Sequence, residues 1–235
     1  MMEGKACVLI HGFTGSPKEI ELIAEHLRKR GIQVITPVLP GHGESLNRKE
    51  MRKYNRKDWI DTAEKAVKEM VESYQEVYLI GFSMGGLISS YLASKYPIKK
   101  LVLLSASVYY MNVKRFSADF RIKLRNRSQL QRYLYKMINT PVRATIQFRK
   151  LVQDLIPYIG HIENPVLIIQ GEKDDLVDPK SAQYIYDTVR SKEKYLHLLP
   201  QSKHIVCWDS EKEQVVELID QFLFSNLTDE EVRDE

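Results

Sequence analysis

The sequence of 235 residues has little that would suit a disulfide-rich, secreted or membrane-spanning protein. Its two cysteines, Cys7 and Cys207, cannot form a disulfide framework. No run of about 18 apolar residues is present that could span a bilayer, and the N-terminal stretch lacks the pattern of a secretory signal. We therefore expect a cytoplasmic protein with a full hydrophobic core.

A large excess of one charge is also missing. The net charge is only +4, and no nucleic-acid-binding motif is recognisable, so we expect no nucleic-acid partner. Basic residues nevertheless gather between Lys114 and Lys150, where Asp119 is the only acid. We expect most of these charges to lie on solvated helix faces, with weak contact to anionic membrane surfaces as a further hypothesis. Histidines and cysteines show no paired ligand spacing, so no metal site is predicted.

Short apolar runs alternate with segments of helical periodicity, which predicts an α/β fold with a mostly parallel sheet of about six strands flanked by helices. The expected strands are 5–10, 33–37, 76–80, 101–104, 165–170 and 195–199. Helices are expected from Pro17 to the glycine stop at Gly31, and over 58–74, 87–96, 181–189 and 211–224.

The stretch 108–157 interrupts this alternation. It contains no strand-like run, and its apolar residues fall at helical spacing. Because it lies between two predicted strands, it must leave the sheet and return to it. We therefore expect a helical cap at 108–157, inserted into a core formed by 1–107 and 158–235.

A candidate nucleophile stands between a predicted strand and a predicted helix, in the sequence Gly81-Phe82-Ser83-Met84-Gly85. This G-x-S-x-G pattern in a sharp strand-to-helix turn exposes the serine hydroxyl at the start of a helix, where developing negative charge is favoured. The alternative is a plain turn serine that caps the helix.

A serine nucleophile needs a histidine base and an acid that orients it. His204 follows a late predicted strand. In this architecture the nucleophile, the acid and the histidine follow one another along the chain, so the acid should lie in the loop after the preceding strand. Of the three aspartates in that loop, Asp174 comes first after the strand, three residues past Gly171, whereas Asp178 precedes a proline and suits a helix cap and Asp175 suits an exposed position. We predict that Ser83, Asp174 and His204 act together.

Acyl transfer also requires N–H donors for the oxyanion. The residue after the nucleophile, Met84, should supply one, and Phe13, in the glycine-containing loop after the first strand, should supply the other. The alternative for this loop is a turn without a ligand.

The substrate should lie between these residues and the cap. Phe13, Tyr109, Tyr110 and Met111 are candidates for its walls, with ordinary packing as the alternative for each. An apolar wall beside an oxyanion hole suits an ester with a hydrophobic acyl chain. We expect a small-molecule ester as the substrate.

Five motifs together give a strong resemblance to the α/β-hydrolase superfamily, and within it to small bacterial carboxylesterases and monoacylglycerol lipases. They are His11-Gly12-Phe13-Thr14-Gly15, Pro40-Gly41-His42-Gly43, Gly81-Phe82-Ser83-Met84-Gly85-Gly86, Gly171-Glu172-Lys173-Asp174 and Lys203-His204. The resemblance implies a small helical cap, no cofactor, triad roles for Ser83, Asp174 and His204, and oxyanion donation by Phe13 and Met84. It also implies a reduced sheet, since the chain starts almost at the strand before His11.

Several functions remain open on this fold, because function depends on the site and not on the architecture. The alternatives to ester hydrolysis are thioester hydrolysis, acyl transfer, carbon–carbon bond hydrolysis and a non-catalytic ligand-binding homologue. We expect a monomer or a homodimer.

Overall fold

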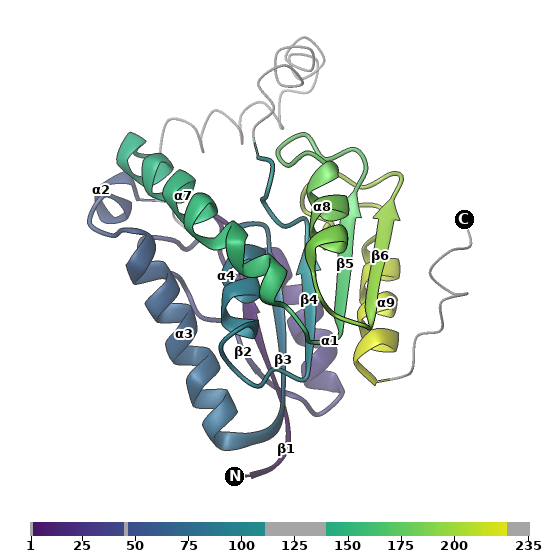
Figure 1. Ribbon diagram of the computed structural model, residues 1–235. Helices are drawn as coiled ribbons and strands as arrows, with labels where there is room; N and C mark the ends of the chain where they lie inside the picture. The colour runs from purple at the N-terminus through teal and green to yellow at the C-terminus, as the bar shows by residue number, and fades with distance from the viewer. Residues whose placement is uncertain (1, 45–46, 111–139, 225–235) are drawn as a thin grey trace.

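A single sheet of six parallel strands forms the centre of the molecule, in the order β2-β1-β3-β4-β5-β6. The computed structural model describes residues 2–44, 47–110 and 140–224 (Figure 1). The predicted parallel sheet is confirmed. The strands are β1 (Met2–Ile10), β2 (Gln33–Ile35), β3 (Tyr74–Phe82), β4 (Lys100–Leu104), β5 (Val166–Gly171) and β6 (Lys194–Leu199).

The strand order reverses at β1. The chain pairs β2 on one side of β1 and then returns to place β3 on the other side, after which β4, β5 and β6 follow outward. In open parallel sheets, the loops at such a switch point separate at the carboxyl ends of the strands and leave a crevice for ligands. The loops after β1 and β3 therefore border the expected position of a site.

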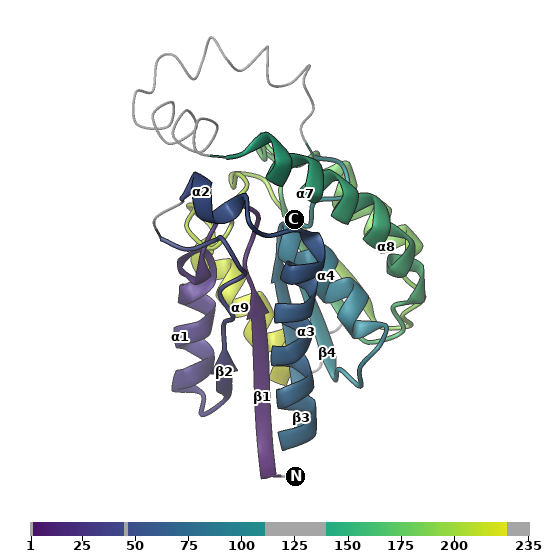
Figure 2. The same ribbon diagram turned by 90° about the vertical axis from the view of Figure 1, so that its left-hand side faces the viewer.

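Helices cover both faces of the sheet (Figures 1 and 2). Alternate residues of β1 face opposite sides: Val8 packs in the cluster that includes α3 and α4, whereas Leu9 packs with α1 and α9. One face carries α1 (Glu21–Lys29) and α9 (Lys212–Phe224), and the other carries α3 (Arg56–Ser73), α4 (Met84–Ala93), α7 (Val142–Leu155) and α8 (Lys180–Thr188). Three short elements complete the described chain: η1 (Pro17–Ile20), α2 (Arg48–Met51) and η2 (Ile156–His161).

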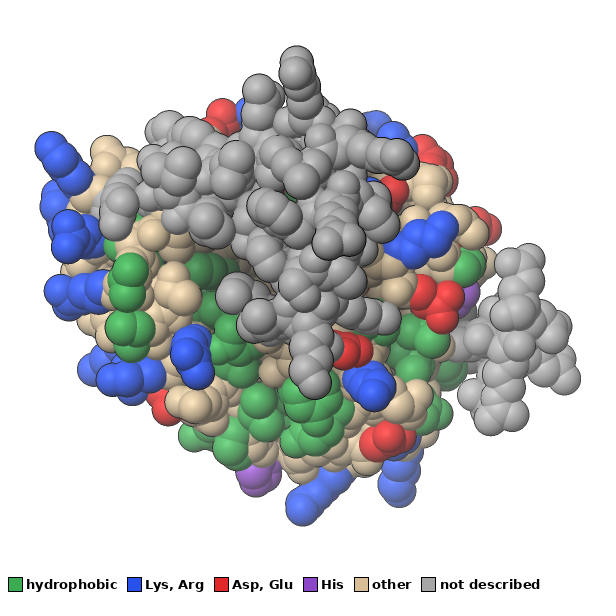
Figure 3. All heavy atoms as spheres, turned by 90° about the horizontal axis from the view of Figure 1, so that it is seen from above, with side chains coloured by type: hydrophobic (Ala, Val, Ile, Leu, Met, Phe, Trp, Pro, Cys, Tyr) green, Lys and Arg blue, Asp and Glu red, His purple; other side chains and the backbone are tan. Residues whose placement is uncertain are grey.

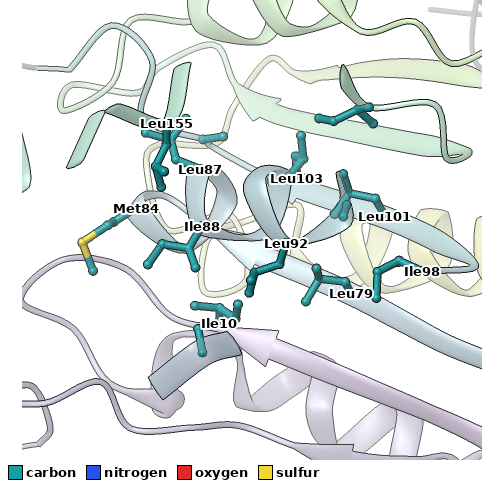
Figure 4. Packing of buried hydrophobic residues seen from close by; sticks show 14 of the residues in the cluster. Ile10, Leu79, Met84, Leu87, Ile88, Leu92, Ile98, Leu101, Leu103 and Leu155 are labelled. Atoms are coloured by element: carbon teal, nitrogen blue, oxygen red, sulfur yellow. The ribbon is translucent and has the colours of Figure 1, made fainter. Parts of the chain in front are cut away.

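Helix α4 lies between the sheet and α7. Leu87, Ile88 and Leu92 are fully buried in one cluster with Leu79 of the sheet and Leu155 of α7 (Figure 4). A helix that is apolar on all sides requires neighbours on all sides, and α7 supplies the outer cover. The N-terminus of α4 is thereby held rigidly at the carboxyl edge of the sheet.

Some element boundaries differ from the sequence-based expectations. Strand β2 ends at Ile35 and not at 37, where Pro37 has no N–H group for the sheet. Helix α4 begins at Met84 and not at 87, so the helix starts directly after Ser83. The four-residue helix α2 was not predicted, because a single turn leaves no periodic pattern.

The expected cap at 108–157 falls partly outside the described residues, which exclude 111–139. Its C-terminal part forms α7, whose Phe148, Leu151 and Leu155 pack in the same hydrophobic cluster as the sheet. The division into core and cap stays a prediction. In the part of the chain that the structure describes, no helix is both long enough and apolar enough to cross a membrane.

Candidate active site

Ser83 occupies a strained turn between β3 and α4. Its backbone has φ 55° and ψ −115°, a conformation that non-glycine residues rarely adopt. The turn is held by a 2.8 Å hydrogen bond from the Ser83 N–H to the carbonyl of Leu104, and by the close approach of Gly85 to β1. A Cβ on Gly85 would lie 2.1 Å from the carbonyl oxygen of Ile10, so only glycine fits there. Strain maintained by its surroundings is a feature of functional sites.

The imidazole of His204 joins this serine to a carboxylate. Its Nε2 lies 3.0 Å from Oγ of Ser83, and its Nδ1 lies 2.7 Å from Oδ2 of Asp174. All three side chains are buried, with exposed fractions of 7%, 8% and 3% for Ser83, His204 and Asp174. A carboxylate can only accept, so Nδ1 carries a proton and the neutral ring presents a lone pair to Ser83. The structure thus brings together the three residues predicted from widely separated motifs.

The loop that carries His204 is fixed to the end of β5. The N–H of Lys173 donates to the carbonyl of Ser202 at 3.0 Å. A Cβ on Gly171 would lie 2.4 Å from the carbonyl oxygens of both Ser202 and Lys203, so the close approach depends on glycine. The loops after β5 and β6 therefore form one unit, which sets the distance between Asp174 and His204.

Four hydrogen bonds hold the Asp174 carboxylate. Oδ1 accepts from the backbone N–H groups of Leu176 at 2.8 Å and Val177 at 2.9 Å, while Oδ2 accepts from His204 and from the Gln170 amide at 2.9 Å. Burial alone would raise the pKa of Asp174. The positive charge that the His204 ring carries when it is protonated, together with the hydrogen bonds from His204, Val177 and Leu176, outweighs burial and lowers this pKa below its ordinary value. Asp174 is consequently an anion that cannot rotate freely.

Two backbone N–H groups are available for an oxyanion. The hydrogen bonds among the described residues leave the N–H groups of Phe13 and Met84 without an acceptor. Met84 is the first residue of α4, where N–H groups lack intrahelical partners and the helix dipole favours negative charge. The loop containing Phe13 lies beside the serine, since a Cβ on Gly12 would be 3.2 Å from the Ser83 Cβ.

Buried polar side chains shape the loop that contains Phe13. The N–H of Gly12 donates to Oε2 of Glu19 at 3.3 Å, and Glu19 is only 6% exposed. The His11 ring accepts from the N–H of Leu39 at 3.1 Å through Nε2, and its Nδ1 lies 2.9 Å from the carbonyl oxygen of Gly12. His11 thereby connects the loop after β1 with the loop after β2.

Two histidines beside this loop are held in the neutral form. Burial lowers the pKa of His11 to about 4, although its bond to Gly12 opposes this shift. Burial, together with the neighbouring His11, lowers the pKa of His42 to about 3. Neither ring can carry a positive charge near neutral pH, so His204 is the ring at this site that is placed to exchange a proton with Ser83.

Phe13, in the loop after β1, belongs to an aromatic cluster. The rings of Phe13 and Phe148 are stacked, with centroids 4.7 Å apart and an interplanar angle of 6°, and Tyr110 lies 4.7 Å from Phe148. The ring of Tyr109 instead packs against Tyr184 of α8 and is 46% exposed. Of the predicted wall residues, the structure thus joins Phe13 and Tyr110 in one cluster and separates Tyr109 from them. Met111 lies outside the described residues.

Phe148, Gln170 and Ser107 were not identified from the sequence. Gln170 is a polar residue at the end of the otherwise apolar strand β5, and this exception was a usable signal. Ser107 follows β4 at the carboxyl edge of the sheet, and its side chain is 1% exposed.

Among the described residues no group of three or more His, Cys, Asp or Glu side chains is arranged to hold a metal ion.

Comparison with known proteins agrees with this architecture. Residues 5–144 match the family model described as alpha/beta hydrolase fold, and since the match spans more than half of the chain, the chain belongs to this family. A second model, described as serine aminopeptidase S33, matches residues 117–211.

Two similar relatives are bacterial enzymes. The chain is 26% identical over 229 residues to a carboxylesterase of Bacillus subtilis (strain 168), across 93% of this chain and 92% of the relative. It is 27% identical over 225 residues to a thermostable monoacylglycerol lipase of Bacillus sp. (strain H-257), across 89% and 86%. Among solved structures, a metagenome-derived lipolytic enzyme superposes with a TM-score of 0.78 at 24% identity, covering 93% of each chain. The structural likeness shows the shared fold.

Proposed function

We propose that this chain is a serine hydrolase that cleaves carboxylic esters with a hydrophobic acyl chain. The observation that carries the proposal is the continuous hydrogen-bonded path from Ser83 Oγ through the His204 ring to Asp174, with distances of 3.0 and 2.7 Å. A serine hydroxyl is a weak nucleophile until a base accepts its proton. The ester as substrate is supported by the names of two relatives, a carboxylesterase and a monoacylglycerol lipase.

The reaction begins when Ser83 Oγ attacks the ester carbonyl carbon and its proton passes to Nε2 of His204. The C–O bond to the alcohol then breaks, and the alcohol leaves with the proton from Nε2. Water attacks the resulting acyl-enzyme and gives one proton to Nε2. The acid departs as Ser83 recovers that proton, so the enzyme returns to its starting state.

Negative charge develops on the carbonyl oxygen during both attacks. The N–H groups of Phe13 and Met84 are the proposed donors to that oxyanion, because neither has an acceptor among the described residues. Losing one such donor typically costs about 3 kcal/mol in the transition state. The helix dipole of α4 adds to this stabilisation at its N-terminus.

The acyl chain is proposed to lie against the aromatic cluster of Phe13, Tyr110 and Phe148. Seen from the carboxyl ends of the strands, patches of hydrophobic side chains are visible in the lower middle of this face, and many Lys and Arg side chains lie along its rim (Figure 3). An apolar surface beside fixed N–H donors favours a hydrophobic acyl group over a charged one.

The stretch 108–157 is proposed as a helical cap. Exposed basic residues of α7 such as Arg143 and Arg149 would give this cap a weak electrostatic attraction to anionic membrane surfaces. A cytoplasmic location is supported by Cys7 and Cys207, which are both free and buried. The chain is proposed to act as a monomer or a homodimer.

A substrate panel tests the proposed function. Wild type should hydrolyse p-nitrophenyl esters and monoacylglycerols faster than matched thioesters and amides, and Ser83→Ala should lose this activity. Faster turnover of a thioester would support a thioesterase instead. Full ester hydrolysis by Ser83→Ala would overturn the serine mechanism.

A further inference from the structure

A second hydroxyl group contacts the proposed nucleophile. Oγ of Ser107 lies 2.9 Å from Oγ of Ser83, and the Ser107 side chain is 1% exposed. The backbone holds this contact in place, because the N–H of Ser107 donates to the carbonyl of Ser83 at 3.3 Å. Ser107 is carried by the loop after β4, whose Leu104 is also bonded to the Ser83 N–H. The two serines are therefore fixed to each other at both backbone and side chain.

The direction of this hydrogen bond follows from the bonding capacity of each group. A hydroxyl has one proton to donate and two lone pairs that accept. Nδ1 of His204 donates to Asp174, so in the neutral ring Nε2 can only accept. The Ser83 hydroxyl must therefore donate its one proton to Nε2. Ser107 is then left as the donor to Ser83, and one lone pair of the Ser83 oxygen remains free.

We propose that Ser107 is a positioning residue whose hydroxyl donates to Ser83 Oγ and directs the free lone pair of that oxygen toward the substrate. This inference rests on the proposed function. The Ser107 proton stays on Ser107 throughout, while the Ser83 proton passes to His204 as described above. The 2.9 Å contact thus sets the orientation of the attacking oxygen without entering the proton transfer.

The contribution of Ser107 should be larger in acylation than in deacylation. As Ser83 transfers its proton, its oxygen gains negative charge, and hydrogen bonds to charged acceptors are stronger than those to neutral ones. In the acyl-enzyme the same oxygen is an ester oxygen, which accepts a hydrogen bond less well and gains charge only as it leaves. Loss of the Ser107 hydroxyl should therefore slow acylation more than deacylation.

The same loop provides a matched control. Ser105 is also fully buried, yet its Oγ has no hydrogen-bond partner among the described residues. Ser105→Ala and Ser107→Ala each remove one buried hydroxyl from the loop after β4, and only the second removes a contact with Ser83. A general effect of loosening this loop would appear in both variants.

The test compares the second-order rate constants with which wild type, Ser107→Ala and Ser105→Ala react with a fluorophosphonate. We expect Ser107→Ala to react about tenfold more slowly, equivalent to about 1.4 kcal/mol in the barrier, and Ser105→Ala to stay within about twofold of wild type.

Separate acylation and deacylation rates with p-nitrophenyl butyrate complete the test, and the first should fall more than the second. Should Ser107→Ala fail to fold, Ser107→Cys, a weaker donor of similar size, takes its place with the same expected direction. Wild-type reactivity in a folded Ser107 variant, or an equal fall in both rates, would overturn the positioning role. Absence of labelling in wild type would instead overturn the proposed function.

Discussion

Oδ2 of Asp174 accepts a 2.7 Å hydrogen bond from Nδ1 of His204, across 30 positions of the chain. The two residues lie in loops that follow neighbouring parallel strands, β5 and β6. Parallel pairing brings the ends of both strands to the same edge of the sheet. The contact therefore depends on strand register, and the remaining acceptor sites of Asp174 are taken by backbone and Gln170 donors.

Replacement of Asp174 by Asn tests the importance of this contact. An amide can present its NH₂ group to Nδ1, which would favour the tautomer that has no lone pair on Nε2 to accept the Ser83 proton. We expect Asp174→Asn to lower kcat for p-nitrophenyl butyrate by about three to four orders of magnitude. The matched control is Asp178→Asn, since Oδ1 of Asp178 accepts from the N–H of Lys180 at 3.0 Å and the side-chain oxygen of asparagine can accept the same hydrogen bond. Similar losses in both variants would contradict the assignment.

The close approach of α4 to β1 predicts that Gly85 tolerates no side chain. In Gly85→Ala the Cβ would lie 2.1 Å from the Ile10 carbonyl oxygen and 2.7 Å from that of His11, and both are backbone atoms. The variant should lose about 1–3 kcal/mol in the free energy of unfolding, and its kcat/KM should fall because the backbone of Ile10 and His11, which leads to Phe13, must shift. Gly160→Ala is the control, since its Cβ would only touch Thr188 at 3.8 Å. Urea unfolding and ester hydrolysis measure both effects; unchanged values for Gly85→Ala would contradict the packing.

Phe148 is expected to limit the length of acyl chain that fits beside Phe13. Phe148→Ala removes a ring stacked on Phe13 at 4.7 Å and should leave room for additional methylene groups. The ratio of kcat/KM for p-nitrophenyl decanoate to that for butyrate should rise at least about fourfold, the effect of one more buried methylene. Ile146→Ala, on the same helix and 46% exposed, should leave the ratio unchanged. An unchanged ratio in Phe148→Ala would place the acyl chain elsewhere.

Stability should depend on pH through the buried His11. Its folded-state pKa of about 4 lies below the ordinary value of 6.5, so below pH 6.5 the unfolded chain binds more protons than the folded one. The free energy of unfolding therefore decreases as pH falls from 6.5 toward 4, by about 1.4 kcal/mol per pH unit for this group. His11→Gln should reduce the loss between pH 7.5 and pH 5 by about 2 kcal/mol.

Chemical denaturation at the two pH values measures this difference. His161→Gln, which changes an exposed histidine, serves as the control. If His11→Gln and wild type lose the same stability between pH 7.5 and pH 5, His11 is not held neutral by burial.

Most of the sheet could be predicted because buried parallel strands require continuous apolar runs. The strand β5, with Val166, Leu167, Ile168 and Ile169 all buried, is such a run, and Gly171 marks its end. The sharp turn at Ser83 was also predictable, because the glycines on both sides of it permit the close backbone contacts that such a turn requires. These signals are local, and therefore visible in the sequence.

The contacts that depend on tertiary register were not predictable. Ser107 meets Ser83 because Phe82 pairs with Leu104 in the sheet, and no property of Ser107 alone indicates that pairing. Phe148 stacks on Phe13 because α7 returns across α4, and the helical periodicity of α7 gives no direction for its path. Separation of Tyr109 from Tyr110 likewise follows from the position of α8.

Ser83 is the residue proposed to form the covalent intermediate. Intact-protein mass spectrometry after fluorophosphonate treatment, with proteolytic mapping of the adduct, measures this. We expect a single adduct on the peptide that contains Ser83 and no adduct in Ser83→Ala. An adduct on a different residue, or equal labelling of Ser83→Ala, would contradict it.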